Sequence, residues 1–167
     1  MDEAFIKKVQ PNSPEAEQSV IGAMIMDRDA IADVIDIVSA DDFYQKQNGI
    51  LFEAMTELYR EGKPVDLVTL QNKLKKKDVP ESMKSLEFIR DLLEAVPTSA
   101  NAKQYAKIVS EKATLRKLIK VTEDITTECY LGKDDVTEIL DHTEKNVFGL
   151  LQQASGREDF VPIDKVV

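Results

Sequence analysis

The amino-acid sequence predicts an all-α fold, in which a compact bundle of short helices is followed by a long antiparallel helical hairpin. Two features of the composition favour helices: few residues favour strands or break helices, and good helix formers are frequent. Aromatic residues are only 6% of the chain, with no Trp, and the 167 residues include just 6 Gly and 6 Pro. Good helix formers recur in runs between these breakers. The third observation is that apolar residues return every three to four positions along most of the chain.

Length, composition and charge narrow the class of protein. With 43% hydrophobic and 32% charged residues, the chain has the composition of one folded domain, or of a small domain with an appendage. Its net charge of −9 disfavours tight autonomous binding to nucleic acid, because phosphates would repel it. The single cysteine, Cys129, excludes an intramolecular disulfide, and the sequence contains no secretory signal and no apolar run of membrane-spanning length. We therefore expect a cytoplasmic protein with no membrane association.

The first elements begin at clear local signals. Residues 1–12 show no sustained period and are expected to form a flexible N-terminal arm. A globular helical domain is expected over residues 13–97. Its first helix should start with Ser13 as the N-cap and Pro14 in the first turn, and Glu17 suits the positive end of the helix. The apolar stripe of this helix comprises Val20, Ile21, Met24 and Ile25.

Four further short helices are expected in this domain, each bounded by capping or breaking residues. The second covers about residues 30–38, with Asp29 as its cap. The third ends at Gly62, which suits a left-handed C-terminal position. The fourth is capped by Asp66, and the fifth must stop before Pro97. Short helices joined by short loops are typical of a compact helical domain.

A helical hairpin is expected over residues 98–153. No Pro or Gly interrupts residues 99–131, which as one helix would be about 50 Å long. Gly132 ends this helix, and an amphipathic return helix follows. The apolar positions of the pair are Tyr105, Ile108, Leu115, Leu118, Ile119, Thr122, Ile125 and Cys129, then Val136, Ile139, Leu140, Thr143, Val147, Leu150 and Leu151. Two helices are too thin to bury such wide stripes, so a partner chain is expected.

Residues that could carry chemistry are few. The pairs Gly62-Lys63 and Gly132-Lys133 lack the earlier glycine of a phosphate-binding loop, so we expect no nucleotide site in this chain. His142 stands alone, so we expect no metal site. The pair Asp41-Asp42 is better explained by capping than by catalysis. We expect Cys129 to be a small buried or half-buried side chain, and the run Lys73, Lys75, Lys76, Lys77 to be a solvated helix end. The sequence thus predicts no catalytic residue, cofactor or metal.

Several motifs resemble the N-terminal region of DnaB-type replicative DNA helicases. They are PNSPEAE at 11–17 with IGA at 21–23, DFY at 42–44, PVDLVTL at 64–70, VPTSAN at 96–101 with YAKIV at 105–109, and LRKLI at 115–119. Together they cover nearly the whole chain. The sequence departs from the family at Asn48, where a His is frequent, and at residues 81–85, where a Gly-Gly pair is usual. These departures concern loops and caps, and affect the expected surface near residues 78–86.

The resemblance implies a function for the parent protein. It would be a ring-shaped hexamer that unwinds DNA, with ATP and Mg²⁺ bound by a RecA-like motor domain beyond residue 167. Residues 154–167 would then begin the linker to that motor, and this fragment would be non-catalytic. The resemblance further implies that the N-terminal regions form dimers, three of which build a collar. The collar would receive the C-terminal domain of primase, with the helicase loader as a second candidate partner, and DNA would pass through the full-length ring.

Two sets of residues are candidates for these contacts. We assign hairpin self-association to Leu115, Leu118, Thr122, Ile139, Thr143 and Val147, and partner docking to Phe88, Ile119 and Ile125. Ordinary core packing is an equally good explanation of the first set and a slightly better explanation of the second, because packing within one chain and between chains uses the same apolar pattern. The oligomeric state therefore stays open at this point.

Two other classes of function remain as alternatives. A free-standing helical adaptor or regulatory dimer would use the same hairpin and have no motor domain, and the open reading frame would decide between the two. A helical hydrolase acting through Asp41 and Asp42 would require a measurable activity that is lost when either carboxylate is changed.

Overall fold

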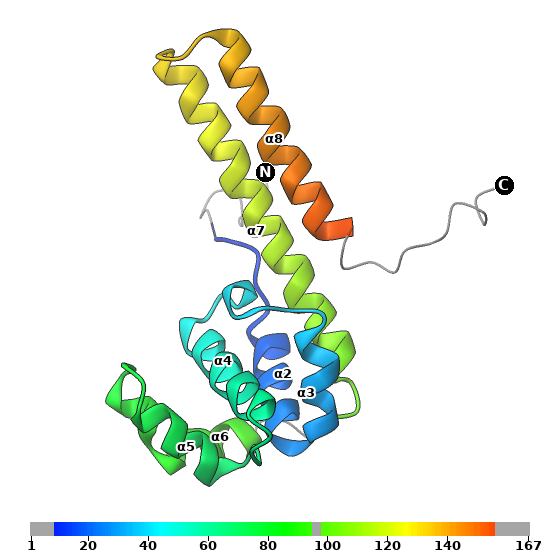
Figure 1. The fold of residues 1–167 in the computed structure, drawn as a ribbon, viewed down its shortest axis with the longest axis vertical. Coiled ribbons are helices and arrows are strands. Elements are labelled where there is room, and N and C mark those ends of the chain that lie inside the picture. Colours follow the sequence, from blue (N-terminus) through cyan, green and yellow to red (C-terminus); the bar gives the residue numbers. More distant parts are fainter. Residues whose placement is uncertain (1–8, 95–97, 156–167) are drawn as a thin grey trace, which may run out of the picture. The chain divides into compact units, whose positions relative to one another are not determined.

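The structure is a computed structural model, and it describes residues 9–94 and 98–155 (Figure 1). Every regular element within these ranges is helical, so the predicted all-α class is confirmed. The chain divides into two compact units, which are described separately. One comprises residues 12–113, and the other combines residues 1–11 with residues 114–167. The elements are α2 Pro14–Met26, α3 Arg28–Ile35, η1 Ala40–Asp42, α4 Lys46–Arg60, α5 Leu67–Lys75, η2 Glu81–Lys84, α6 Leu86–Glu94, α7 Ala102–Leu131 and α8 Val136–Ser155.

The first two helices meet at a joint of one residue. The side chain of Ser13 accepts a hydrogen bond from the backbone N–H of Ala16, which confirms it as the N-cap of α2. The cap predicted for the next helix is wrong, because Asp27 and not Asp29 occupies that position. Asp27 has an extended backbone just before Arg28, and its Oδ1 accepts from the N–H of Asp29 at 2.9 Å. Asp29 lies inside the first turn, where it cannot cap.

The signals around α4 and α5 are confirmed. Gly62 follows α4 with a φ of 70°, a left-handed conformation that favours glycine. Asp66 caps α5, since its Oδ1 accepts from the backbone N–H groups of Val68 and Thr69, each at 2.9 Å. The short helix η2 lies before α6, within the region where the sequence departs from the family's usual pattern.

The core of the first unit is built by all of its helices. Its largest fully buried apolar side chains are Ile21, Met24, Ile31, Leu51, Met55, Leu70, Leu74, Met83 and Ile89. The first turns of α7 add the small residues Ala102, Ala106 and Val109 to the same cluster. Each large apolar side chain buried in this way contributes about 1.5–3 kcal/mol relative to exposure. The core therefore fixes α2 between its neighbours.

Two buried carboxylates organise the approach to α4. Glu17 of α2 is only 2% exposed, and it accepts hydrogen bonds from Tyr44 N at 2.6 Å, Gln45 N at 3.1 Å and Asn48 Nδ2 at 3.0 Å. It thereby satisfies backbone donors at the start of α4 that have no partner within that helix. Asp42 is also buried, and its Oδ2 accepts from the backbone N–H and the hydroxyl of Ser39. Capping thus accounts for Asp42, as expected.

In the second unit, α7 from residue 114 onward and α8 run antiparallel as a hairpin (Figure 1). Gly132 ends α7 with a φ of 56°, as predicted. Arg116 Nη1 donates to the carbonyl oxygen of Pro11 at 2.7 Å, so the segment just before residue 12 is held against α7. Residues 1–8 of the predicted arm and 156–167 of the predicted linker lie outside the described residues. Residues 154 and 155 belong to the last turn of α8.

Candidate assembly and docking surfaces

The two hairpin helices meet along a narrow seam. Its half-buried side chains are Val121, Ile125 and Glu128 on α7 and Ile139, Thr143, Val147 and Leu150 on α8. One pair of facing residues defines how the two helices are aligned: near the turn, His142 Nδ1 on α8 lies 3.8 Å from Glu128 Oε2 on α7. No described residue of α8 is fully buried. The seam therefore covers only part of the apolar surface of the hairpin.

A second apolar surface lies to one side of this seam. Each residue of a helix is rotated by about 100° around the helix axis from the residue before it. Because α7 and α8 run antiparallel, a residue that directly follows a seam residue points to the same side of the hairpin in both helices. These positions form what we call the apolar face. It consists of Leu115, Leu118, Ile119, Thr122, Thr126 and Cys129 on α7, and Leu140, Phe148 and Leu151 on α8. Its leucines and Phe148 are well exposed, from 42% for Leu118 to 63% for Leu140, whereas Ile119 is half-buried.

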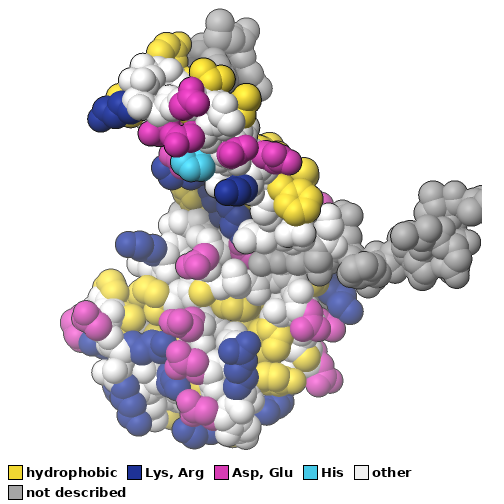
Figure 2. Space-filling model, turned by 45° about the horizontal axis from the view of Figure 1, so that its top comes forward, with side chains coloured by type: hydrophobic (Ala, Val, Ile, Leu, Met, Phe, Trp, Pro, Cys, Tyr) yellow, Lys and Arg dark blue, Asp and Glu magenta, His cyan; other side chains and the backbone are white. Residues whose placement is uncertain are grey.

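The other side of the hairpin is polar. Figure 2 shows Asp and Glu side chains gathered there around the histidine, with Lys side chains among them. On this side Lys120 Nζ donates a hydrogen bond to Asp124 Oδ1 at 2.7 Å, and this bond to the carboxylate raises the pKa of Lys120. Glu138 and His142 are also exposed here. The second unit is thus amphipathic, with one face suited to water and one suited to a partner.

The structure divides the predicted self-association residues between the two surfaces. Leu115, Leu118 and Thr122 lie exposed on the apolar face, whereas Ile139, Thr143 and Val147 are half-buried in the seam. The prediction for Cys129 is wrong, because its side chain is exposed. It follows the seam residue Glu128 and so points outward. Phe148, which was not among the predicted interface residues, also lies on the apolar face because it directly follows the seam residue Val147.

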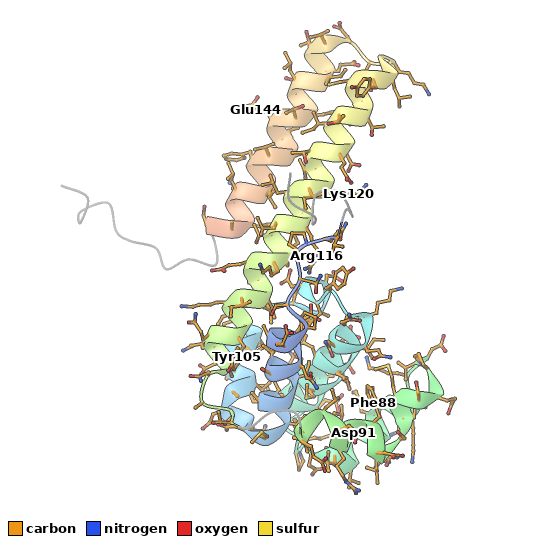
Figure 3. The ribbon with its side chains drawn as sticks, turned by 180° about the vertical axis from the view of Figure 1, so that it is seen from behind. Phe88, Asp91, Tyr105, Arg116, Lys120 and Glu144 are labelled. Carbon is orange, nitrogen blue, oxygen red and sulfur yellow. The ribbon has the colours of Figure 1, made fainter. Side chains whose placement is uncertain are left out.

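The predicted docking residues occupy both units. Phe88 on α6 is half-buried against the core of the first unit, beside Ile89, which is fully buried (Figure 3). Leu86, at the start of α6, is 38% exposed. In the second unit, Ile119 is half-buried on the apolar face and Ile125 is half-buried in the seam. Ile125 therefore supports the hairpin itself, and Phe88 and Ile119 are partly exposed.

A network of ion pairs joins α4 and α5. Lys73 Nζ lies 2.9 Å from Glu57 Oε2 and 2.7 Å from Glu61 Oε1, and Lys77 Nζ lies 2.7 Å from Glu57 Oε1. Hydrogen bonds from Lys63 and Lys73 lower the pKa of Glu61 to about 2. Hydrogen bonds from Lys73 and Lys77 also lower the pKa of Glu57. The prediction that the lysine run is a solvated helix end is therefore wrong for Lys73 and Lys77, which pair with glutamates at or near the end of α4.

These features define a class of protein, an all-helical module that carries a hairpin with one exposed apolar face. None of its described helices could cross a membrane. Residues 9–111 match the sequence profile of the DnaB-like helicase N terminal domain, and the chain belongs to this family.

Relatives and solved structures agree with this assignment. The replicative DNA helicase DnaB of Geobacillus stearothermophilus is 35% identical over 153 residues, which are 92% of this chain and 34% of that protein. The replicative DNA helicase DnaC of Bacillus subtilis is 34% identical over 153 residues, 92% of this chain and 34% of that protein. This chain thus spans about a third of the length of these curated relatives.

Two solved N-terminal domains share the fold. The crystal structure of the DnaB N-terminal domain from Mycobacterium tuberculosis matches with a TM-score of 0.80 and 34% identity, over 84% of this chain and 99% of that one. The DnaB N-terminal domain from Helicobacter pylori, which was described together with its interactions with primase, matches with a TM-score of 0.61 and 23% identity, over 78% of this chain and 99% of that one. The second match supports the fold alone.

Proposed function

We propose that this chain is the non-catalytic N-terminal region of a replicative DNA helicase, and that it helps to assemble the helicase ring by self-association of its hairpin. The observation that carries the proposal is the exposed apolar face. Leu118, Leu140 and Phe148 present large side chains on one side of a thin element, with polar residues on the other side. An apolar surface of this kind on a two-helix element favours a contact with a second copy of the chain.

The size of the apolar face agrees with such a contact. The 20 residues of α8 give a length of about 30 Å, and two helices are about 20 Å wide. One copy would thus contribute roughly 600 Å², and two copies would bury roughly 1,200 Å², the lower end of the range for specific interfaces. A dimer built in this way would be reversible, and contacts elsewhere in a longer chain would be needed to close a hexamer.

Substitution of Leu118 tests the self-association. We expect the mass of the wild-type chain, measured by light scattering, to rise above the monomer's 18.8 kDa as concentration increases. Leu118→Asp should weaken association by at least about tenfold, because dimer formation would bury an unpaired charge. Thr127→Asp is the matched control, since it adds the same charge to α7 away from the apolar face. If Leu118→Asp follows the wild-type curve at every concentration, the proposed interface is wrong.

We also propose that the chain docks the C-terminal domain of primase through Phe88, and through Ile119 where the second copy leaves it exposed, with Ile125 holding the hairpin in shape. Support comes from the partial exposure of Phe88 on α6. Primase is the candidate partner because the Helicobacter pylori domain, which has the same fold, was described together with its interactions with primase. Calorimetry with the cognate primase domain should show weaker binding for Phe88→Ala. Val68→Ala is the control, because Val68 is 60% exposed on the neighbouring helix α5. Equal affinity for the two variants would remove Phe88 from the docking surface.

The remaining parts of the proposal concern a full-length protein. There, ATP and Mg²⁺ would bind in a motor domain outside this chain, and DNA would be held by the ring as a whole. The helicase loader is a second candidate partner, and the same calorimetry with a loader in place of primase would test it. The adaptor alternative would be supported if the gene encodes no motor domain in the same reading frame.

A further inference from the structure

One charged residue interrupts the apolar face. Glu144 of α8 lies four residues after Leu140 and four before Phe148, so all three side chains share one side of the helix. Leu140 is 63% exposed and Phe148 is 58% exposed, and Glu144 is exposed between them. Figure 3 shows Glu144 on α8 in the second unit. Among the described positions of the apolar face, no other Asp, Glu, Lys or Arg is present.

Glu144 has no counterion within its own helix. The positions three and four residues away, whose side chains it could reach, hold Asp141, Leu140, Val147 and Phe148. Lys145 follows directly and therefore points to a different side. Within residues 9–94 and 98–155, the structure gives Glu144 no hydrogen bond or ion pair. Its carboxylate is therefore stabilised by water.

We propose that Glu144 limits the affinity of hairpin self-association. The inference rests on the proposed contact between two apolar faces. When a second copy covers the face, the carboxylate must lose water, and a carboxylate that is buried without a cation is strongly unfavourable. Because a two-fold contact uses the same surface on both copies, each dimer brings two such carboxylates into one interface. Glu144 thus keeps the association weak and disfavours arrangements in which it would be fully covered.

The test compares dimer dissociation constants, measured by sedimentation equilibrium, for the wild-type chain and two variants. Glu144→Leu should lower the Kd by about tenfold or more, because it removes the desolvation cost and adds apolar area. Glu144→Gln should lower the Kd by a smaller factor, since the amide is neutral but still polar. Glu138→Leu is the matched control: the same substitution in the same helix, but on the polar side, should leave the Kd unchanged. Thermal unfolding of dilute samples checks that every variant folds.

The outcomes separate this inference from the proposed function. An unchanged or higher Kd for Glu144→Leu, in a chain whose association Leu118→Asp abolishes, would overturn the role of Glu144 and leave self-association intact. A higher Kd would mean that a cation of the second copy pairs with the carboxylate. If the wild-type chain and Glu144→Leu are both monomeric at every concentration, the proposed self-association fails, and the inference fails with it.

Discussion

Replacing Glu17 by Ala should destabilise the first unit strongly. The carboxylate is 2% exposed and accepts three hydrogen bonds, from the backbone N–H groups of Tyr44 and Gln45 and from the side-chain amide of Asn48. The partners lie 27 to 31 residues away in the chain. Glu17 therefore links α2 to the start of α4, and its removal would leave three donors without an acceptor.

The expected loss follows from these three bonds. A buried donor that loses its partner costs about 1–3 kcal/mol, and bonds to charged acceptors are at the upper end of that range. Water entering the space left by the side chain would bond to some of these donors, so we expect the free energy of unfolding to fall by about 3–5 kcal/mol in total. Domains are stable by only about 5–15 kcal/mol. At about 4 °C or more for each kcal/mol, the melting temperature should fall by at least about 12 °C.

Urea and thermal unfolding followed by circular dichroism would measure this loss. Glu15→Ala is the matched control, because Glu15 lies in the same turn of α2 but is exposed. It should cost at most about 0.5 kcal/mol. Glu17→Gln keeps one acceptor oxygen and should fall between the two. If Glu17→Ala costs no more than Glu15→Ala, the reasoning about the buried carboxylate is wrong.

Three further predictions concern close packing, pH and the hairpin seam. Gly49→Ala should cost about 1–3 kcal/mol in urea unfolding, because the added Cβ would lie 2.7 Å from the carbonyl oxygen of Ala40; an unchanged midpoint would count against that contact. The low pKa of Glu61 means that its ion pairs stabilise the fold above about pH 4.5 and that this contribution disappears as the pH falls from 4.5 toward 2. Melting temperatures across that range should fall less steeply for Lys73→Met than for the wild-type chain, and parallel curves would contradict this. Ile125→Ala should speed hydrogen exchange of α8 amides in the monomer by weakening the seam, whereas unchanged exchange would assign Ile125 to an interface.

Local signals explain why much of the fold could be predicted from the sequence. Ser13 and Asp66 cap helices through atoms two or three residues away, and Gly62 and Gly132 adopt left-handed conformations that few other residues tolerate. The same local reasoning failed at Asp29, because two acidic residues compete for one cap. Asp27 is the cap because it is the single residue between the end of α2 and the start of α3.

By itself the sequence determined the all-α class, most helix ends and, through its motifs, the family. Only the tertiary structure decided which polar and apolar side chains are covered. Glu17 was expected simply to suit a helix start, and distant partners make it a buried acceptor. Along the hairpin, Ile125 and Leu118 follow the same apolar period, yet one lies in the seam and the other is exposed. The physical reason is that helical periodicity specifies a stripe, whereas the register of the second helix specifies which part of that stripe is buried.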